Sequence, residues 1–262
     1  MKKRIWELDF LRGFSIIMMV FDHLMYDLKS IPSWFSNYRE IDRPIVAAMV
    51  AFARSYWTGE LRANAHLIFV AFFLLVSGIS FSFSRSNWKR GLRFLAVAAI
   101  ISLVTLPVEE FTGLRIGIVF GIIHLFAVGT LFTYLIRRLI RNEYLILGIG
   151  IGILWLGVFW DFTRVPYANS ITWDNLFDIV IGRLGYGADY FGLVPYVGVI
   201  LIGTVIGAWF YRGHASLLPK LDRGWNRPFV WAGRNSLWIF VLHQLVLAGL
   251  IFGIGYLLGY QI

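Results

Sequence analysis

Long apolar runs separated by basic loops restrict this chain to one broad class of fold. Of its 262 residues, 58% are apolar, and the mean hydropathy is +0.70. A helix of about 20 apolar residues is long enough to cross a bilayer. Runs of about this length occur at about 10–28, 64–84, 91–107, 115–136, 144–160, 190–211 and 236–258. We therefore expect an all-α, polytopic membrane helix bundle with about seven transmembrane spans, formed as a single domain over residues 1–262.

The basic residues indicate on which side of the membrane each loop lies. With a cytoplasmic N-terminus, the inner segments hold sixteen of the 24 Lys and Arg residues, and the outer segments hold eight with most of the acids. Cytoplasmic loops carry such an excess. We therefore expect the N-terminus inside and the C-terminus outside. The net charge of +9 then reflects topology and gives no reason to expect nucleic-acid binding.

Two further segments test this topology. An eighth span through 44–56 would reverse every later loop, but the run is short and ends at Arg54, so we expect a re-entrant or interfacial helix. The basic start leads into a polar-bearing span without a small-residue cleavage site, which favours a retained cytoplasmic segment over a signal peptide. Because the chain has no Cys, disulfides, thiolate chemistry and Cys-bound metals are excluded.

The first span carries an unusual number of charges for a membrane helix. On an α-helix, Arg12 and His23 share one face about 16 Å apart, and Asp9 and Asp27 lie within about 60° of the same line. Asp22 adds a further charge. Ionisable groups inside a membrane are costly and by default indicate function. A buried ion-pair network that only holds helices together is the alternative.

His23 is our first candidate for a catalytic base, because histidine titrates near neutrality. Asp27, one turn later, could orient the ring or form an ordinary ion pair, and Asp22 lies to one side of it. His124, in the middle of its span, suits a site and a hydrogen-bonded core position equally well. For His243 we favour a role in helix packing.

Two arginines at the start of the third span are candidates for binding phosphate. Arg90 and Arg93 are one turn apart beside Trp88, and arginine binds phosphate through paired hydrogen bonds. Ordinary positive-inside charge is the alternative for either residue. His66 shares a face with Ser77 and Ser84, which could line a polar channel or bond to the backbone. We expect His214 to be uninvolved, and we predict no metal site.

The two outer loops, 29–63 and 161–189, mix aromatic rings with carboxylates and amides. Such mixtures suit a sugar, because rings stack on its apolar face while acids bind its hydroxyls. The aromatic belt at the lipid headgroups is the alternative. The residues concerned are Trp34, Phe35, Tyr38, Tyr56, Trp57, Trp173, Asp174, Asn175, Asp178, Asp189 and Tyr190.

Glycine pairs spaced four residues apart predict close helix packing. These pairs are Gly117/Gly121, Gly148/Gly152, Gly203/Gly207, Gly249/Gly253 and Gly255/Gly259. None sits at a strand-to-helix turn, so none resembles a phosphate-binding loop.

Several segments together resemble a known family. Residues 8–23, 72–78 and 90–93 are similar to the first elements of the transmembrane acyltransferase superfamily. Within it, residues 121–124, 189–196 and 233–244 resemble the heparan-α-glucosaminide N-acetyltransferase catalytic-domain family, and the resemblance runs from residue 4 to about 245. It implies that His23 matches the catalytic histidine of the superfamily's O-acyltransferases. In the family's lysosomal enzyme, an asparagine stands at that position and a histidine in the first lumenal loop, where Arg54 and its neighbours fall here.

We therefore expect a membrane acetyltransferase that moves an acetyl group from cytoplasmic acetyl-CoA to an externally reached acceptor. The expected acceptor is a sugar or amino sugar of a glycan or glycolipid, and the expected location is the cytoplasmic membrane of a prokaryote, among membrane lipids. Arg90 and Arg93, with Arg12, would hold the CoA phosphates. His23 would take the proton from the attacking group, helped by Asp27. The acceptor, the acyl chain length and the oligomeric state stay open.

Two other classes compete with this interpretation. A transporter or flippase could use the same charged stripe as a pathway, although the sequence has no inverted repeat. A b-type cytochrome would need axial histidines, but His23 and His124 differ in depth by about 7 Å, which suits one haem poorly.

Overall fold

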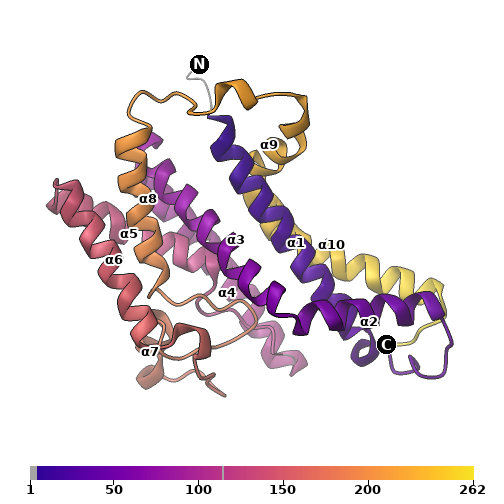
Figure 1. Ribbon diagram of the computed structural model, residues 1–262. Helices are drawn as coiled ribbons and strands as arrows, with labels where there is room; N and C mark the ends of the chain where they lie inside the picture. Colours follow the sequence, from indigo (N-terminus) through magenta and orange to yellow (C-terminus); the bar gives the residue numbers. More distant parts are fainter. Residues whose placement is uncertain (1–4, 114) are drawn as a thin grey trace. The chain divides into compact units, whose positions relative to one another are not determined.

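The computed structural model describes residues 5–113 and 115–262, which are mainly helical and contain no β-strand, so the predicted all-α fold is confirmed (Figure 1). The α-helices of this part of the chain are α1 (Trp6–Trp34), α2 (Pro44–Thr58), α3 (Glu60–Ile79), α4 (Asn87–Thr112), α5 (Ile122–Leu139), α6 (Glu143–Phe159), α7 (Trp173–Ile181), α8 (Tyr196–Phe210), α9 (Arg227–Arg234) and α10 (Ser236–Leu257). Short 3₁₀ helices are η1 (Ser80–Phe83), η2 (Phe162–Arg164), η3 (Pro219–Leu221) and η4 (Gly224–Asn226).

Each predicted span coincides with one of the longer helices. Among the described residues, four helices are long and apolar enough to cross a membrane: Glu60–Phe83, Asn87–Thr112, Ile122–Leu139 and Ser236–Leu257. Two apolar helices, α6 and α8, are shorter, and α1 is long but carries the charged residues. The chain is therefore a helical membrane protein, and the number of seven spans stays a prediction. The segment 44–56 is helical as predicted, within α2.

Two of the predicted spans begin later than expected. The fifth helix starts at Ile122, because the Gly121 N–H donates to Nδ1 of His124 at 3.3 Å and this contact caps the helix. Upstream, the Gly117 N–H donates to the Glu109 carboxylate at 2.5 Å, so this part of the predicted span is a tethered loop. The helix α8 starts at Tyr196, directly after Pro195.

The chain divides into two compact units. The first consists of Met1–Phe73 and Ser216–Ile262, and the second consists of Leu74–Ala215. The prediction of one domain over the whole chain is not tested by this division.

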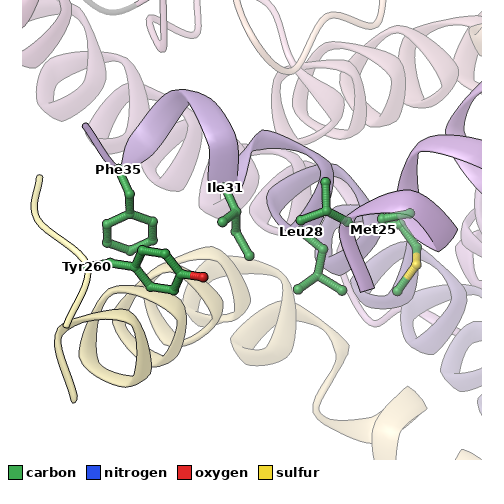
Figure 2. Close-up of a cluster of buried hydrophobic side chains, with 7 residues drawn as sticks. Met25, Leu28, Ile31, Phe35 and Tyr260 are labelled. Carbon is green, nitrogen blue, oxygen red and sulfur yellow. The ribbon is translucent and has the colours of Figure 1, made fainter. Parts of the chain in front are cut away.

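In the first unit, α1 and α10 run side by side in the same direction (Figure 1). His23 contacts His243, and further along the same two helices Trp34 stacks on Phe252, with ring centroids 5.3 Å apart. Figure 2 shows Met25, Leu28 and Ile31 of α1, Phe35 directly after it, and Tyr260 from the C-terminal segment. These side chains, with Val50 and Ala53 of α2, form the buried cluster of this unit.

The short helix α9, which we did not predict from the sequence, packs against the first half of α1 so closely that backbone atoms of the two helices are in contact. A Cβ atom added to Gly13 would lie 1.8 Å from the carbonyl oxygen of Phe229, and one added to Gly233 would lie 1.8 Å from that of Asp9. Only glycine permits this approach, because real Cβ atoms do not come so close to a backbone oxygen.

The second unit is built from two antiparallel helix pairs. Phe94 of α4 packs on Phe126 of α5, and α6 packs on α8 around Ile146, Leu201 and Val205.

The predicted glycine pairs differ in whether they bring helices close together. Gly203 and Gly207 lie against the C-terminal end of α3 and η1, which confirms the predicted close packing. For Gly148, Gly152, Gly249 and Gly253 the prediction is wrong, because a Cβ atom there would meet no other described atom within 4 Å.

Candidate functional site

The ring of His23 is half-buried on α1, and its tautomer is set by the backbone. Its Nδ1 lies 3.0 Å from the carbonyl oxygen of Met19, one turn earlier. A carbonyl oxygen can only accept a hydrogen bond, so Nδ1 carries the proton in the neutral ring. The lone pair is then on Nε2, which is the atom that can take up a proton.

A second histidine, from α10, stands against the first. The ring centroids of His23 and His243 are 4.7 Å apart, and the rings are nearly perpendicular, at 84°. Nδ1 of His243 lies 2.6 Å from the carbonyl oxygen of Phe240, so its Nε2 also carries a lone pair. That Nε2 atom is buried and has no hydrogen-bond partner among the described residues. Each ring therefore has a lone pair on Nε2 and donates its Nδ1 proton to a backbone carbonyl oxygen.

The carboxylate of Asp27 is completely buried beside this histidine pair. The Gln244 side chain donates to its two oxygens at 2.9 and 3.0 Å, from the residue that follows His243 on α10. Asp27 therefore ties α10 to α1 at the level of the two rings. The hydrogen bond that orients the His23 ring, which we expected from Asp27, comes from the carbonyl of Met19. The catalytic role of Asp27 stays a prediction.

The carboxylate of Asp22 faces the start of α3 and the end of α2. Arg62 donates to it from two nitrogens, at 2.8 and 2.6 Å, and the Tyr56 hydroxyl donates at 3.1 Å. Nδ1 of His66 lies 3.7 Å from the same carboxylate, and the Arg62 guanidinium lies 3.9 Å from the centre of the Trp57 ring. Asp22 thus joins three helices through a charged cluster that sequence reasoning missed. Only the charge of Arg62, within the predicted outer loop, could have indicated it.

At the other end of α1, Arg12 belongs to a second charged cluster. Its guanidinium lies 3.2 Å from Oδ1 of the buried Asp9, and Nε of Arg234 lies 3.3 Å from Oδ2 of the same residue. Arg12 and His23 therefore lie on the same helix at two different positions along its axis, as the sequence predicts.

The predicted phosphate-binding arginines lie in the second unit, at the start of α4. Arg90 donates to the hydroxyl of Ser77 at 2.7 Å and to its carbonyl oxygen at 3.3 Å. Arg93, one turn later, is exposed. Arg90 is therefore held by the C-terminal end of α3, whereas Arg93 is accessible to a ligand.

His124 also lies in the second unit, and both of its ring nitrogens are bonded to protein. Nδ1 accepts from the Gly121 N–H, so Nε2 carries the proton, and it lies 2.9 Å from the hydroxyl oxygen of Ser102. That hydroxyl in turn donates to the carbonyl oxygen of Ile118 at 2.7 Å. These hydrogen bonds occupy both ring nitrogens of His124 and cap the N-terminus of α5. They favour a hydrogen-bonded core position for His124 over a catalytic one.

The polar residues of the 161–189 loop mostly support the backbone. Asn175 and Thr172 form a capping box at the start of α7, and the Asp189 carboxylate accepts from the Ile122 N–H at 3.2 Å. A hydrogen bond from the Tyr186 hydroxyl to Glu109, together with burial, raises the pKa of Tyr186 to about 12. Trp173 is 90% exposed and is available to a lipid headgroup or a sugar.

No metal centre is evident in the part of the chain that the structure describes. No group of three or more His, Asp or Glu side chains in it lies close enough together to hold a metal ion.

The fold and the histidine pair define an integral membrane protein of the helical class, with ionisable groups concentrated on its first helix. A family model described as heparan-alpha-glucosaminide N-acetyltransferase, catalytic, matches residues 4–56 and, in an overlapping second segment, residues 46–245. The chain belongs to this family, which confirms the resemblance seen in its sequence, and it is thereby a membrane protein of an acetyltransferase family. Comparisons with curated proteins and with solved structures found no match.

Proposed function

We propose that the protein transfers an acetyl group from cytoplasmic acetyl-CoA to a hydroxyl or amino group of a sugar reached from the opposite side of the membrane. Membership of the family supports the reaction class and a sugar-type acceptor. The observation that carries the proposal within this chain is the His23–His243 pair, in which each ring has a lone pair on Nε2. The membrane we propose is the cytoplasmic membrane of a prokaryotic cell.

His23 acts as the general base in this proposal. Its Nε2 takes the proton from the acceptor's O–H or N–H as the oxygen or nitrogen attacks the acetyl carbonyl carbon. The carbon–sulfur bond of the thioester then breaks, and the CoA thiolate leaves. The proton held by the two imidazoles passes to that thiolate, so that the products are the acetylated acceptor and free CoA. General acid–base catalysis of this kind contributes about 10²–10⁴-fold in rate.

The carboxylates and arginines have distinct parts. Asp27 positions His243 through the neighbouring Gln244, while Asp22 positions the outer half of α1 through Arg62. Arg12 provides positive charge for the donor's phosphates, and Arg90 and Arg93, in the second unit, are separate candidates for binding phosphate. We give His124 no part in the chemistry beyond holding the start of α5.

The test is release of CoA by the purified protein in proteoliposomes loaded with candidate sugars and amino sugars. Because the chain has no Cys, a thiol reagent detects CoA without any background from the protein. We expect acceptor-dependent release of CoA when acetyl-CoA is added outside. Uptake or efflux of the sugar without any release of CoA would support a transporter and overturn the proposal.

A further inference from the structure

A cavity in the first unit lies where α9 meets the beginning of α1, away from the histidine pair. Its volume is about 500 Å³, within the range of sites that hold a small organic ligand. Its lining residues are Trp6, Asp222, Asn226, Arg227, Val230, Trp231 and Arg234. None of these residues has a part in the proposed chemistry.

Two of the lining residues are held by hydrogen bonds to other parts of the first unit. Trp6 is buried, and its Nε1 donates to the carbonyl oxygen of Leu218 at 3.1 Å. Asn226 is also buried, and its side chain donates to Asp222 at 3.1 Å. These bonds hold one indole face and one amide in place before any ligand binds, which lowers the entropic cost of binding.

Three other lining residues of the cavity, all from α9, are cationic or aromatic. Arg227 and Arg234 are exposed, and Trp231 is 63% exposed, although all three line the cavity. An exposed indole beside two guanidinium groups suits a planar base that carries phosphate: the indole stacks on the base, and arginine binds phosphate through paired hydrogen bonds.

The cavity lies at the N-terminal end of α1, which is the end that we expect on the cytoplasmic side, where the donor is. Arg234, which lines the cavity, shares the Asp9 carboxylate with Arg12, so the Arg12 cluster adjoins the cavity through this residue. From Arg12, an axial distance of about 16 Å leads to the level of His23. A pantetheine arm has about thirteen bonds between its diphosphate and its sulfur, and an extended chain advances about 1.2 Å per bond, so the arm also spans about 16 Å.

We propose that this cavity binds the 3′-phosphorylated adenosine end of the acyl donor, with Trp231 against the base and Arg227 and Arg234 on phosphate. The diphosphate then lies near Arg12, and the thioester reaches the His23 level. This inference rests on the proposed function for the identity of the donor. A phosphate-bearing lipid headgroup offers related chemistry, and the experiment separates the two sources.

The test is calorimetric binding of adenosine 3′,5′-bisphosphate to the purified protein in a detergent without anionic lipid. This probe has no acetyl group, so the result does not depend on catalysis. We expect it to bind the unaltered protein, and we expect Arg227→Gln and Trp231→Ala each to weaken binding by about tenfold or more, because each removes one charge-assisted or stacking contact. Both side chains are exposed, so neither change disturbs the core.

The matched control is Arg223→Gln, which removes the same charge four residues earlier in the chain, at an exposed residue outside the cavity. An equal loss of affinity in this control, or unchanged affinity in the Arg227→Gln/Trp231→Ala variant, would overturn the proposal. So would retention of phosphatidylglycerol that depends on Arg227 while the bisphosphate fails to bind.

Failure of the cavity and failure of the proposed function give different results. If the protein releases CoA normally while the cavity variants bind donor normally, the cavity assignment is wrong and the function stands. If the bisphosphate binds as expected but acetyl-CoA is never turned over, the cavity stands and the function is wrong.

Discussion

Nε2 of His23 is the atom on which the proposed chemistry depends, and its availability follows from one backbone hydrogen bond. Because the Met19 carbonyl holds the proton on Nδ1, the neutral ring presents a lone pair on the other nitrogen. His124 shows the opposite arrangement, since a backbone N–H occupies its Nδ1 and a hydroxyl lies at its Nε2. Histidine therefore has a free lone pair at one position and a hydrogen-bonded, helix-capping role at the other, and the neighbouring groups determine which.

Replacing His23 by Gln tests the base directly. Gln keeps a hydrogen-bonding group but cannot take up a proton near neutrality, so we expect CoA release to fall about 10²–10⁴-fold while donor binding is nearly unchanged. Turnover and calorimetry measure the two effects, and the melting temperature checks folding. His214→Gln, in a loop that we expect to be uninvolved, is the control. Near-normal turnover in a well-folded His23→Gln protein would exclude His23 as the base.

Replacing His243 distinguishes proton sharing from packing. His243→Phe keeps a ring against His23 but removes Nε2, and His243→Gln removes the ring. If His243 shares the proton, both variants should lower kcat with little change in the KM for acetyl-CoA, and the pH–rate profile should lose one ionisation. If the ring only packs, His243→Phe should retain activity and an unaltered pH profile, which contradicts our assignment.

The arginines of α4 are tested by Arg93→Gln, alone and with Arg90→Gln. We expect the double variant to bind acetyl-CoA about tenfold more weakly or worse, because charge-assisted contacts to phosphate are lost. Arg85→Gln, an exposed residue in the preceding loop, controls for the general loss of charge. Unchanged affinity in the folded double variant would leave these arginines with a topological role alone.

The helix α1 owes its position to glycines near its start and to hydrogen-bonded carboxylates near its middle. Near its start, Gly13 and Gly233 let α9 approach until backbone atoms meet. Near the middle, Asp22 binds Arg62 and Asp27 binds Gln244. A carboxylate buried in this way is costly unless it is bonded, so these contacts also decide which neighbour can pack there.

Gly13→Ala should destabilise the protein, because the added carbon would lie 1.8 Å from the Phe229 carbonyl oxygen. Overpacking of this kind costs about 1–3 kcal/mol, and the melting temperature in detergent should fall by several degrees. Gly148→Ala is the matched control, because a Cβ atom there meets nothing within 4 Å. In that helix interior, Ala should be neutral or stabilising by up to about 1 kcal/mol. Equal melting temperatures for the two variants would contradict the close crossing.

The parallel course of α1 and α10 constrains how many times the chain crosses the membrane. If both helices span the membrane in one direction, the chain between them must cross it an odd number of times. The five apolar helices α3, α4, α5, α6 and α8 satisfy this condition, whereas counting α2 as a sixth crossing would violate it. The direction of the two neighbouring helices therefore fits an odd number of crossings between them, and the number of seven spans stays a prediction.

Single cysteines test this topology without interference, because the chain has none of its own. We expect Asn169→Cys to react with a membrane-impermeant thiol reagent in intact cells and Asp222→Cys to react only after lysis. The physical reason is the excess of Lys and Arg on the segments that we place inside. The reverse pattern of labelling would contradict the cytoplasmic N-terminus and with it the cytoplasmic entry of the donor.

The sequence by itself determined the helical membrane class, the positions of the long helices and the alignment of Arg12 with His23. These features depend on the length of apolar runs and on the 100° turn per residue, which are local properties. It also carried the family, through motifs spread along the chain. One boundary error also has a local cause. Hydropathy places the start of α5 too early, because the hydrogen bond between Gly121 and His124 at which the helix begins does not change the hydropathy of the segment.

Only the tertiary structure decided which side chains meet. The sequence favours helix packing for His243, and the structure shows that the ring it packs against is that of His23. For Asp27 the sequence leaves open an orienting role or an ordinary ion pair, and the structure pairs it with Gln244. The partners in these contacts lie at opposite ends of the chain, and no periodicity in either segment encodes the register between α1 and α10. That register results from the packing of Met25, Leu28, Ile31 and Phe35 against their neighbours, including Tyr260, and from the need to pair each buried carboxylate.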